Sequence, residues 1–189
     1  MSSPNPATLA GPVTYDIDPT HSSAHFSVRH LMISNVRGEF TKVSGTVVYD
    51  EKNPTASHVS ATIATDSINT RDAQRDGHLK SADFLDTTQF PEITFESTEI
   101  KAKSDDEYAI TGNLTIHGTT NEVTLQVEGL GAPVTDPWGN HRIGVTATTK
   151  INRKDFGLTW NQTLETGGLM VGNDVSITLD IEAVQRRSA

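Results

Sequence analysis

The sequence predicts an all-β protein of about eight antiparallel strands, with one short helical segment near residues 70–86. The composition supports this prediction, because the chain has 26 threonines, 14 valines and 12 isoleucines and β-branched side chains fit a pleated sheet better than a helix. Apolar and polar residues also alternate in short blocks separated by turn residues, which is typical of strands with one buried face. Short connections between the blocks favour either a closed barrel or a two-sheet sandwich.

Length and charge narrow the class of protein. With 189 residues the chain is expected to form one domain. Lysine and arginine number 15 against 24 aspartates and glutamates, a net charge of −9, which disfavours nucleic acid as a partner. Cysteine is absent, so disulfides, thiolate nucleophiles and cysteine-bound zinc are excluded. No apolar run reaches the roughly 18 residues that span a bilayer, so we expect no stable membrane insertion.

The first residues differ from the rest. Residues 1–12 are rich in proline and small residues and lack apolar periodicity, so we expect a flexible tail there and a folded domain over residues 13–189. This segment has neither a basic start nor an apolar stretch. If Met1 is the native start we expect a cytoplasmic protein, whereas a truncated sequence leaves a periplasmic or secreted location open.

Eight blocks carry the alternation, at residues 24–28, 43–49, 59–63, 93–95, 108–116, 123–127, 143–147 and 175–181. Around the second block Phe40 and Val48 differ in parity from their apolar neighbours, which predicts a bulge or an irregular edge near Gly45. Turn residues predict a five-residue hairpin connection at 117–121 and turns at 136–140 and 172–174.

The segment 69–86 breaks the β pattern because its apolar residues do not alternate. Thr70 and Ser81 are suitable N-caps, and Gly77 lies between them. The segment therefore predicts two short helices, broken at Gly77, that cover one end of the sheet.

The inward positions of the last four blocks hold no charged residue, which predicts a dry interior. Aromatic residues make up only 6% of the chain, and many inward positions hold Val, Ile or Ala. A barrel of this length is therefore expected to fall short of the packing density of about 0.75 that cores reach, and an unfilled barrel would enclose an apolar ligand. A sandwich with a solid core is the alternative.

Histidines are the side chains to weigh for chemistry. His21 and His25 are four residues apart, but on a strand their rings lie about 13 Å apart, too far for one metal ion. We therefore expect His21 to close a turn and His25 to face solvent. His30 shares the inward parity of its strand, and His78 lies in the helical segment, so each is either a polar contact for a ligand or a residue that bonds its own surroundings.

No catalytic motif is present. Gly-x-Ser-x-Gly, a phosphate-binding glycine loop and a paired acid and base are all missing, so we predict no catalytic residues and no metal site. Trp138 lies in a turn and either plugs one end or lies on the surface. Phe156 and Trp160 supply large apolar area that either lines a cavity or fills a core.

Five segments of the sequence then stand out together: YDIDPTHSSAHFSVRH (15–30), GEF (38–40), DGHLKSADFLD (76–86), FPEITF (90–95) and GNLTIHGTT (112–120). Their residues and order resemble the YceI-like family of lipid-binding proteins, over roughly residues 13–184. The resemblance implies an extended, lipocalin-like antiparallel β-barrel that holds a polyisoprenoid or another long apolar chain, often a quinone tail, with no established catalytic step. Leu85 stands where the family motif usually has a second Phe, which reduces side-chain volume in the helical segment.

Inward parity and this resemblance together predict the residues that contact the ligand: Phe26, Val28, His30, Ile63, His78, Leu79, Phe84, Ile93, Phe95, Leu114, Ile116, Leu125, Val145, Phe156, Trp160 and Ile177. No cofactor is expected besides the bound polyisoprenoid or quinone-type lipid.

We accordingly expect a protein that sequesters or carries an amphiphilic lipid, with His30 and His78 as candidate contacts for its head group. The negative net charge disfavours lasting residence on anionic membranes, and a homodimer is left open. The alternatives are a hydrolase or isomerase that acts on an amphiphile through His30 or His78, and a solid-core stress or interaction module.

Overall fold

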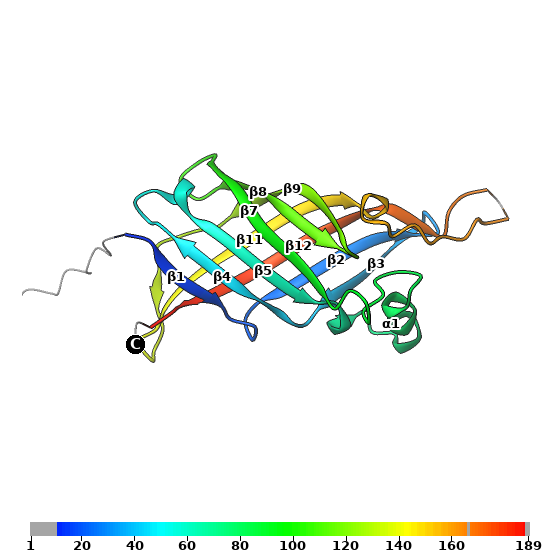
Figure 1. The fold of residues 1–189 in the computed structure, drawn as a ribbon, viewed down its shortest axis with the longest axis horizontal. Helices are drawn as coiled ribbons and strands as arrows, with labels where there is room; N and C mark the ends of the chain where they lie inside the picture. The colour runs from blue at the N-terminus through cyan, green and yellow to red at the C-terminus, as the bar shows by residue number, and fades with distance from the viewer. Residues whose placement is uncertain (1–10, 166, 188–189) are drawn as a thin grey trace, which may run out of the picture.

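The computed structural model describes residues 11–165 and 167–187, so most of the tail expected over residues 1–12 lies outside the described part. Among the described residues the chain forms one antiparallel sheet that closes on itself (Figure 1). Its strands are β1 (Val13–Ile17), β2 (Ser23–His30), β3 (Ser34–Phe40), β4 (Val43–Tyr49), β5 (His58–Ala64), β6 (Ile68–Asn69), β7 (Glu92–Ala102), β8 (Tyr108–Ile116), β9 (Thr119–Glu128), β10 (Val134–Thr135), β11 (His141–Asn152) and β12 (Val171–Gln185).

Eight of these strands form a closed ring in the order β11-β9-β8-β7-β5-β4-β1-β12. The ring closes where β12 pairs with β11 in an unbroken register from Arg142↔Val184 to Asn152↔Asp174. Closure satisfies the hydrogen bonds that the edges of an open sheet would leave unpaired. The prediction of an eight-stranded antiparallel barrel is therefore confirmed, and the two-sheet sandwich is not the architecture.

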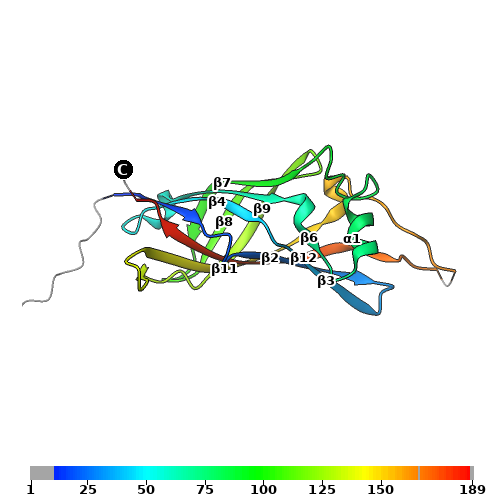
Figure 2. The same ribbon diagram turned by 90° about the horizontal axis from the view of Figure 1, so that it is seen from below.

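The two ends of the barrel differ because β1 and β2 share one side of β12. Residues Ala183–Gln185 of β12 pair with β1, whereas residues from Val171 to Asp180 pair with β2. Beyond β1 the ring continues to β4, but beyond β2 the chain pairs only with β3 and then β6. At this second end the helix α1 (Ala73–Lys80) lies across the opening (Figures 1 and 2). We call it the α1 end and the opposite one the closed end.

Apolar clusters pack both ends. At the closed end Tyr15, Ile143 and Ala183 are buried together. At the α1 end a larger cluster of eight buried side chains includes Leu85 and Phe156. Each end of the barrel thus has an apolar cluster of its own.

The helical segment differs from its prediction. It contains one helix, not two, and Asp72 is the N-cap, since its side chain accepts a hydrogen bond from the Arg75 amide at 3.0 Å. Gly77 lies inside this helix, and Ser81 is its C-cap. The prediction that the segment covers one end of the sheet is confirmed.

Three predicted turns or bulges also need correction. The β4–β5 register is continuous through Gly45, because Phe40 ends a separate strand, β3. The β8–β9 hairpin has a two-residue turn, His117–Gly118, with positive φ at both residues, which matches the twist of the strands. Residues 172–174 are not a turn but a bulge inside β12, whereas the turn at 136–140 does join β10 and β11.

Among the described residues, no helix combines the length and the apolar character that a bilayer-spanning helix needs.

Candidate functional site

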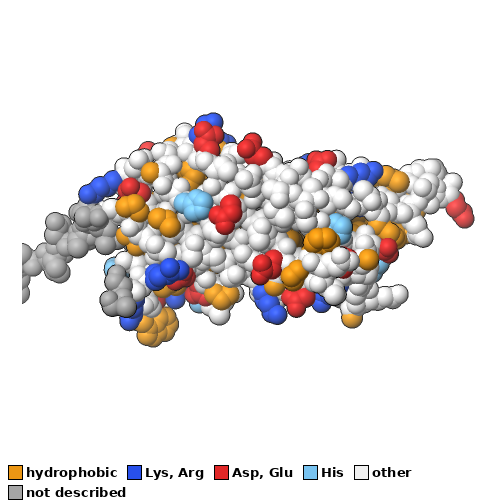
Figure 3. Space-filling view, viewed as in Figure 1, with side chains coloured by type: hydrophobic (Ala, Val, Ile, Leu, Met, Phe, Trp, Pro, Cys, Tyr) orange, Lys and Arg blue, Asp and Glu red, His pale blue; other side chains and the backbone are white. Residues whose placement is uncertain are grey.

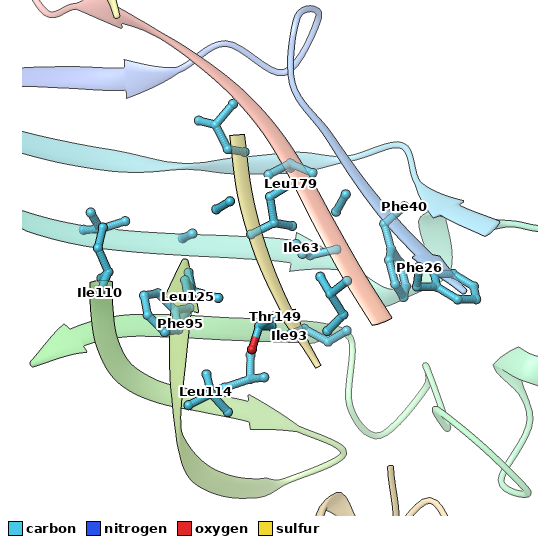
Figure 4. A pocket seen from close by; sticks show the side chains of 18 of the residues that line it. Phe26, Phe40, Ile63, Ile93, Phe95, Ile110, Leu114, Leu125, Thr149 and Leu179 are labelled. Carbon is cyan, nitrogen blue, oxygen red and sulfur yellow. The ribbon is translucent and has the colours of Figure 1, made fainter. Parts of the chain in front are cut away.

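The barrel encloses an apolar cavity of about 300 Å³ between its two ends. Alternate residues of each strand point into it, as Figure 4 shows for side chains from β2, β3, β5, β7, β8, β9, β11 and β12. The volume lies at the lower end of the range of about 300–1,000 Å³ found for small-molecule sites. The interior is therefore hollow, unlike the solid core that the sequence left as an alternative.

Most of the predicted ligand contacts lie on this cavity. The predicted contacts that line it are Phe26, Val28, Ile63, Leu79, Phe84, Ile93, Phe95, Leu114, Ile116, Leu125, Val145 and Ile177. Their contact with a ligand remains a prediction, but the structure brings all twelve to one surface. The period-two alternation of the strands places ten of them there, and the helical segment supplies Leu79 and Phe84.

Glycines make room for two of the lumen's aromatic rings. A Cβ atom on Gly38 of β3 would lie 2.5 Å from the Phe26 ring, and a Cβ on Gly112 of β8 would lie 2.5 Å from the Phe95 ring. Each ring therefore lies flat against the neighbouring strand. A side chain at either glycine would push the ring into the cavity.

The lumen also contains a hydroxyl, from Thr149 (Figure 4). Thr149 Oγ1 donates to the Thr124 carbonyl at 3.0 Å. Because this donor already has a partner in the wall, it does not require a polar group from a ligand.

Four predicted contacts lie off the cavity lining: His30, His78, Phe156 and Trp160. Phe156, only 2% exposed, belongs to the packed cluster at the α1 end. His30 is half-buried at the end of β2, where it pairs with Val171. His30 misses the lumen because parity along one strand does not show where the wall ends, whereas His78, Phe156 and Trp160 lie outside the strands.

His78 and Trp160 instead form a cluster on the outer side of the α1 end. The imidazole centre lies 4.7 Å from the Trp160 ring and 5.1 Å from the Phe84 ring, and His78 Nε2 lies 2.8 Å from Asp83 Oδ2. Phe84 contacts both rings of this cluster and also lines the cavity. His78 is therefore one ring away from the lumen.

Arg153 is a charged lining residue that the sequence analysis missed. It is 3% exposed, and its guanidinium donates to the carbonyls of Leu158 (2.6 Å), Trp160 (2.8 Å) and Gly172 (2.9 Å). Within the described residues no carboxylate lies at ion-pair distance from it. Burial lowers the pKa of Arg153, yet a guanidinium remains charged at neutral pH. We call residues 157–170, which this side chain ties to the barrel, the strap.

The closed end holds a second arginine, in a different setting. Arg142 Nη1 lies 2.8 Å from Asp18 Oδ2, Nε lies 2.9 Å from Asp136 Oδ2, and Glu182 also accepts from it. Hydrogen bonds from Thr20, Arg142 and His21 hold the pKa of Asp18 well below its ordinary value. Partial desolvation opposes a low pKa for Asp136, but hydrogen bonds from Asn140 and Arg142 outweigh it and lower that pKa as well.

This cluster also contains the one group of metal-ligating side chains found among the described residues, Asp18, His21 and Glu182. The Arg142 guanidinium bonds both of its carboxylates, so a cationic side chain already neutralises them. His21 closes the turn after Asp18 at 2.9 Å, and His25 is exposed, as the sequence predicts for both.

The remaining candidates lie at the surface. His58 and His141 begin β5 and β11 and are exposed, His117 lies in the β8–β9 turn with its ring centre 4.5 Å from that of Phe90, and Trp138 is 78% exposed. Trp138 therefore does not plug the barrel.

An antiparallel eight-stranded barrel around an apolar cavity defines the class of this protein: a small lipocalin-like barrel built to enclose a ligand. Comparison with known sequences narrows this class. The family model of the YceI-like domain matches residues 15–183. Protein YceI of Salmonella newport and a UPF0312 protein of Pectobacterium atrosepticum are each 40% identical to the chain over 181 residues, which cover 96% of this chain and 91% and 90% of theirs. The chain belongs to the YceI-like family.

Solved structures share the fold. BcnA of Burkholderia cenocepacia superimposes with a TM-score of 0.77 at 22% identity, covering 88% of this chain and 98% of its own. The YceI protein of Campylobacter jejuni gives 0.70 at 29% identity, covering 84% and 90%. A polyisoprenoid binding domain from Saccharophagus degradans gives 0.67 at 18% identity, covering 92% and 99%.

Proposed function

We propose that this protein binds a long-chain amphiphilic lipid, with a polyisoprenoid or isoprenoid-quinone tail inside the barrel, and sequesters or carries it. The observation that carries the proposal is the apolar cavity of about 300 Å³, whose lining is almost entirely aliphatic and aromatic. Such a lumen disfavours charged ligands, because the lining residue Arg153 already bonds main-chain carbonyls and the apolar lining offers no partners in exchange for water.

The binding energy would come from the tail. Each methylene removed from water contributes about 0.8 kcal/mol, so several isoprene units give useful affinity without a directed hydrogen bond. Length and branching of the tail would decide selectivity, since the wall is closed by strand pairing. The name of the S. degradans neighbour, a polyisoprenoid binding domain, supports the same class of ligand.

The head group would lie at the α1 end. At the closed end the cavity lining is apolar and includes Ile143 and Ala183, so a polar head there would lose its water without gaining partners. At the α1 end, His78 lies next to the lining residue Phe84. His78, and His30 at the end of β2, therefore remain our candidates for contact with a head group that extends from the lumen.

Lipid content tests the proposal directly. Native mass spectrometry of the protein purified without detergent, followed by organic extraction, should reveal a long-chain isoprenoid or another apolar lipid. Decylubiquinone added to delipidated protein should bind with one molecule per chain. No extracted lipid together with no uptake of the quinone would overturn the proposal.

A lumen-filling variant sharpens this test. Val145→Phe places a ring in the cavity, whereas Thr148→Phe adds the same ring to the exposed outer face of β11. We expect the first variant to bind decylubiquinone at least tenfold more weakly and the second to bind as the wild type does. Equal binding by both would mean that the ligand is held elsewhere.

A hydrolase or isomerase acting on an amphiphile is the second candidate, and the observation that favours it is the His78–Asp83 pair. A carboxylate 2.8 Å from an imidazole nitrogen orients the ring as a general base requires. If His78→Ala kept decylubiquinone binding but abolished turnover of a lipid ester, the enzyme would replace the carrier as our proposal.

A further inference from the structure

The turn between β2 and β3 presents apolar side chains to solvent. Met32 is 56% exposed and Ile33 is 77% exposed. With Leu31 they form a continuous apolar turn, which we call the β2–β3 tip. Large exposed apolar residues that lie together usually mark a contact surface.

The backbone of this tip is unusual for its residues. Leu31 and Met32 have φ values of 51° and 61°, and the Ile33 amide donates to the His30 carbonyl at 3.1 Å. Asn and Gly normally supply two positive φ values in such a turn. The chain keeps large apolar side chains where turn chemistry favours small or polar ones, which indicates that the apolar surface itself is used.

The charges around the tip are also distinct from those of the whole protein. Residues 29–37 contain Arg29 and Arg37 and no acidic residue, in a chain with a net charge of −9. Arg29 Nη2 donates to the Met32 carbonyl at 3.0 Å, which holds a guanidinium at the tip. An apolar turn flanked by cations complements an anionic bilayer surface, where phosphates lie above an acyl boundary.

The tip is continuous with the cavity wall. Val171 lines the cavity and pairs with His30, and the Leu31 amide donates to the Met170 carbonyl at 2.8 Å. Val28 also lines the cavity, and β2 ends two residues later at His30, about 7 Å farther along the strand. The tip thus lies at the α1 end, beyond the last lining residues.

We propose that the β2–β3 tip inserts transiently into the surface of an anionic lipid bilayer and brings the α1 end of the cavity to the membrane. This inference rests on the proposed lipid binding and states where lipid would be exchanged. Apolar side chains are exposed at both ends of the molecule (Figure 3). At the closed end, however, Val134 and Trp138 adjoin Asp136, and buried Tyr15 and Ile143 pack the barrel behind them.

Vesicle binding tests the docking surface. The full chain is sedimented with vesicles of phosphatidylcholine alone or mixed with an equal amount of phosphatidylglycerol. The variant Met32→Asn with Ile33→Asn removes the apolar tip, and Asn tolerates positive φ, so its thermal midpoint should not fall. The matched control, Val134→Asn with Trp138→Asn, removes as much exposed apolar surface from the closed end.

We expect the wild type and the control to bind mixed vesicles and the tip variant to bind at least tenfold more weakly. Arg37→Gln should weaken binding only to vesicles that contain phosphatidylglycerol. Failure of the wild type to bind, or equal loss in both double variants, would overturn the proposal. Self-association that disappears with the tip variant, in the absence of vesicle binding, would assign the tip to a second copy of the chain instead.

Uptake of decylubiquinone in vesicle-free solution separates this proposal from the proposed function. If the tip variant takes up the quinone normally but does not bind vesicles, the tip acts in docking alone. If the wild type takes up no quinone yet binds vesicles through the tip, the carrier function fails and the docking surface stands.

Discussion

The two ends of the barrel each hold one arginine largely away from solvent, but the partners differ. At the closed end Arg142 bonds three carboxylates, from Asp18 in the turn after β1, Asp136 in the β10–β11 turn and Glu182 of β12. At the α1 end Arg153 bonds main-chain carbonyls of the strap and of β12. The first arginine joins elements that strand pairing already holds, whereas the second supplies donors to a segment with little regular structure.

This difference has a physical consequence for how each end responds to conditions. Arg–carboxylate pairs weaken when the carboxylates are protonated, so the closed end is sensitive to acid. Guanidinium–carbonyl bonds involve no group that titrates near neutrality, so the bonds that Arg153 makes to the strap are insensitive to pH. The α1 end depends instead on the fork of N–H donors that only arginine provides.

Removing the Arg153 side chain gives the largest expected effect. Arg153→Met leaves several buried carbonyls without a donor, and we expect a loss of about 3–5 kcal/mol in the free energy of unfolding. Hydrogen exchange should accelerate across the strap, while the β11–β12 ladder near the closed end keeps its protection. Urea unfolding and exchange measured by mass spectrometry give both quantities.

Arg153→Lys serves as the comparison variant, because it retains the charge and loses the fork. It should recover only part of the stability. A loss of less than about 1 kcal/mol for Arg153→Met would mean that water replaces the lost donors, and that the strap does not depend on this side chain.

The next prediction compares the stability lost at a residue in a packed cluster with the stability lost at a residue that borders the cavity. Phe156 is 2% exposed within the α1-end cluster, and Phe156→Ala should cost about 3–5 kcal/mol. Leu125 already borders the empty cavity, so Leu125→Ala removes fewer contacts and should cost about 1–2 kcal/mol, below most buried Leu→Ala changes. Urea unfolding of delipidated protein measures both, and equal losses would mean that the lumen is filled.

The inward-facing residues of the barrel wall were predictable because a single pattern, the alternation of apolar and polar residues, determines them. Alternation places residues such as Leu114 and Ile177 on the inner face wherever a strand is regular, and these side chains do line the cavity. The signal fails where strands are short or irregular. β1 alternates over only five residues, Val13–Ile17, and β3 has only Val36 and Phe40 as apolar residues. The bulge near Gly172 looks like a turn because its residues favour turns.

The α1 end was less predictable because its contacts join distant parts of the chain. His78 meets Trp160 only after the strap folds back over the helix, and no local pattern marks that approach. Asp72 is a better N-cap than Thr70 by type, and the Thr70 hydroxyl bonds Asp76 instead. Arg153 gives no local signal either, since its partners are carbonyls that every residue carries.

The smallest expected effect is a difference between the two ends in their sensitivity to acid. The pKa values of Asp18 and Asp136 are lowered in the folded protein, so their stabilising effect is complete above the unfolded pKa, about 4, and is lost as pH falls toward the folded values. Hydrogen exchange should therefore rise at the β10–β11 turn between neutral pH and about pH 3, with the intrinsic acid dependence of exchange subtracted, and should not rise in the strap. Arg142→Gln should flatten the acid dependence of the thermal midpoint, because the carboxylates then titrate nearer their ordinary values. An equal acid response at both ends would show that the carboxylates around Arg142 do not set the acid sensitivity of this barrel.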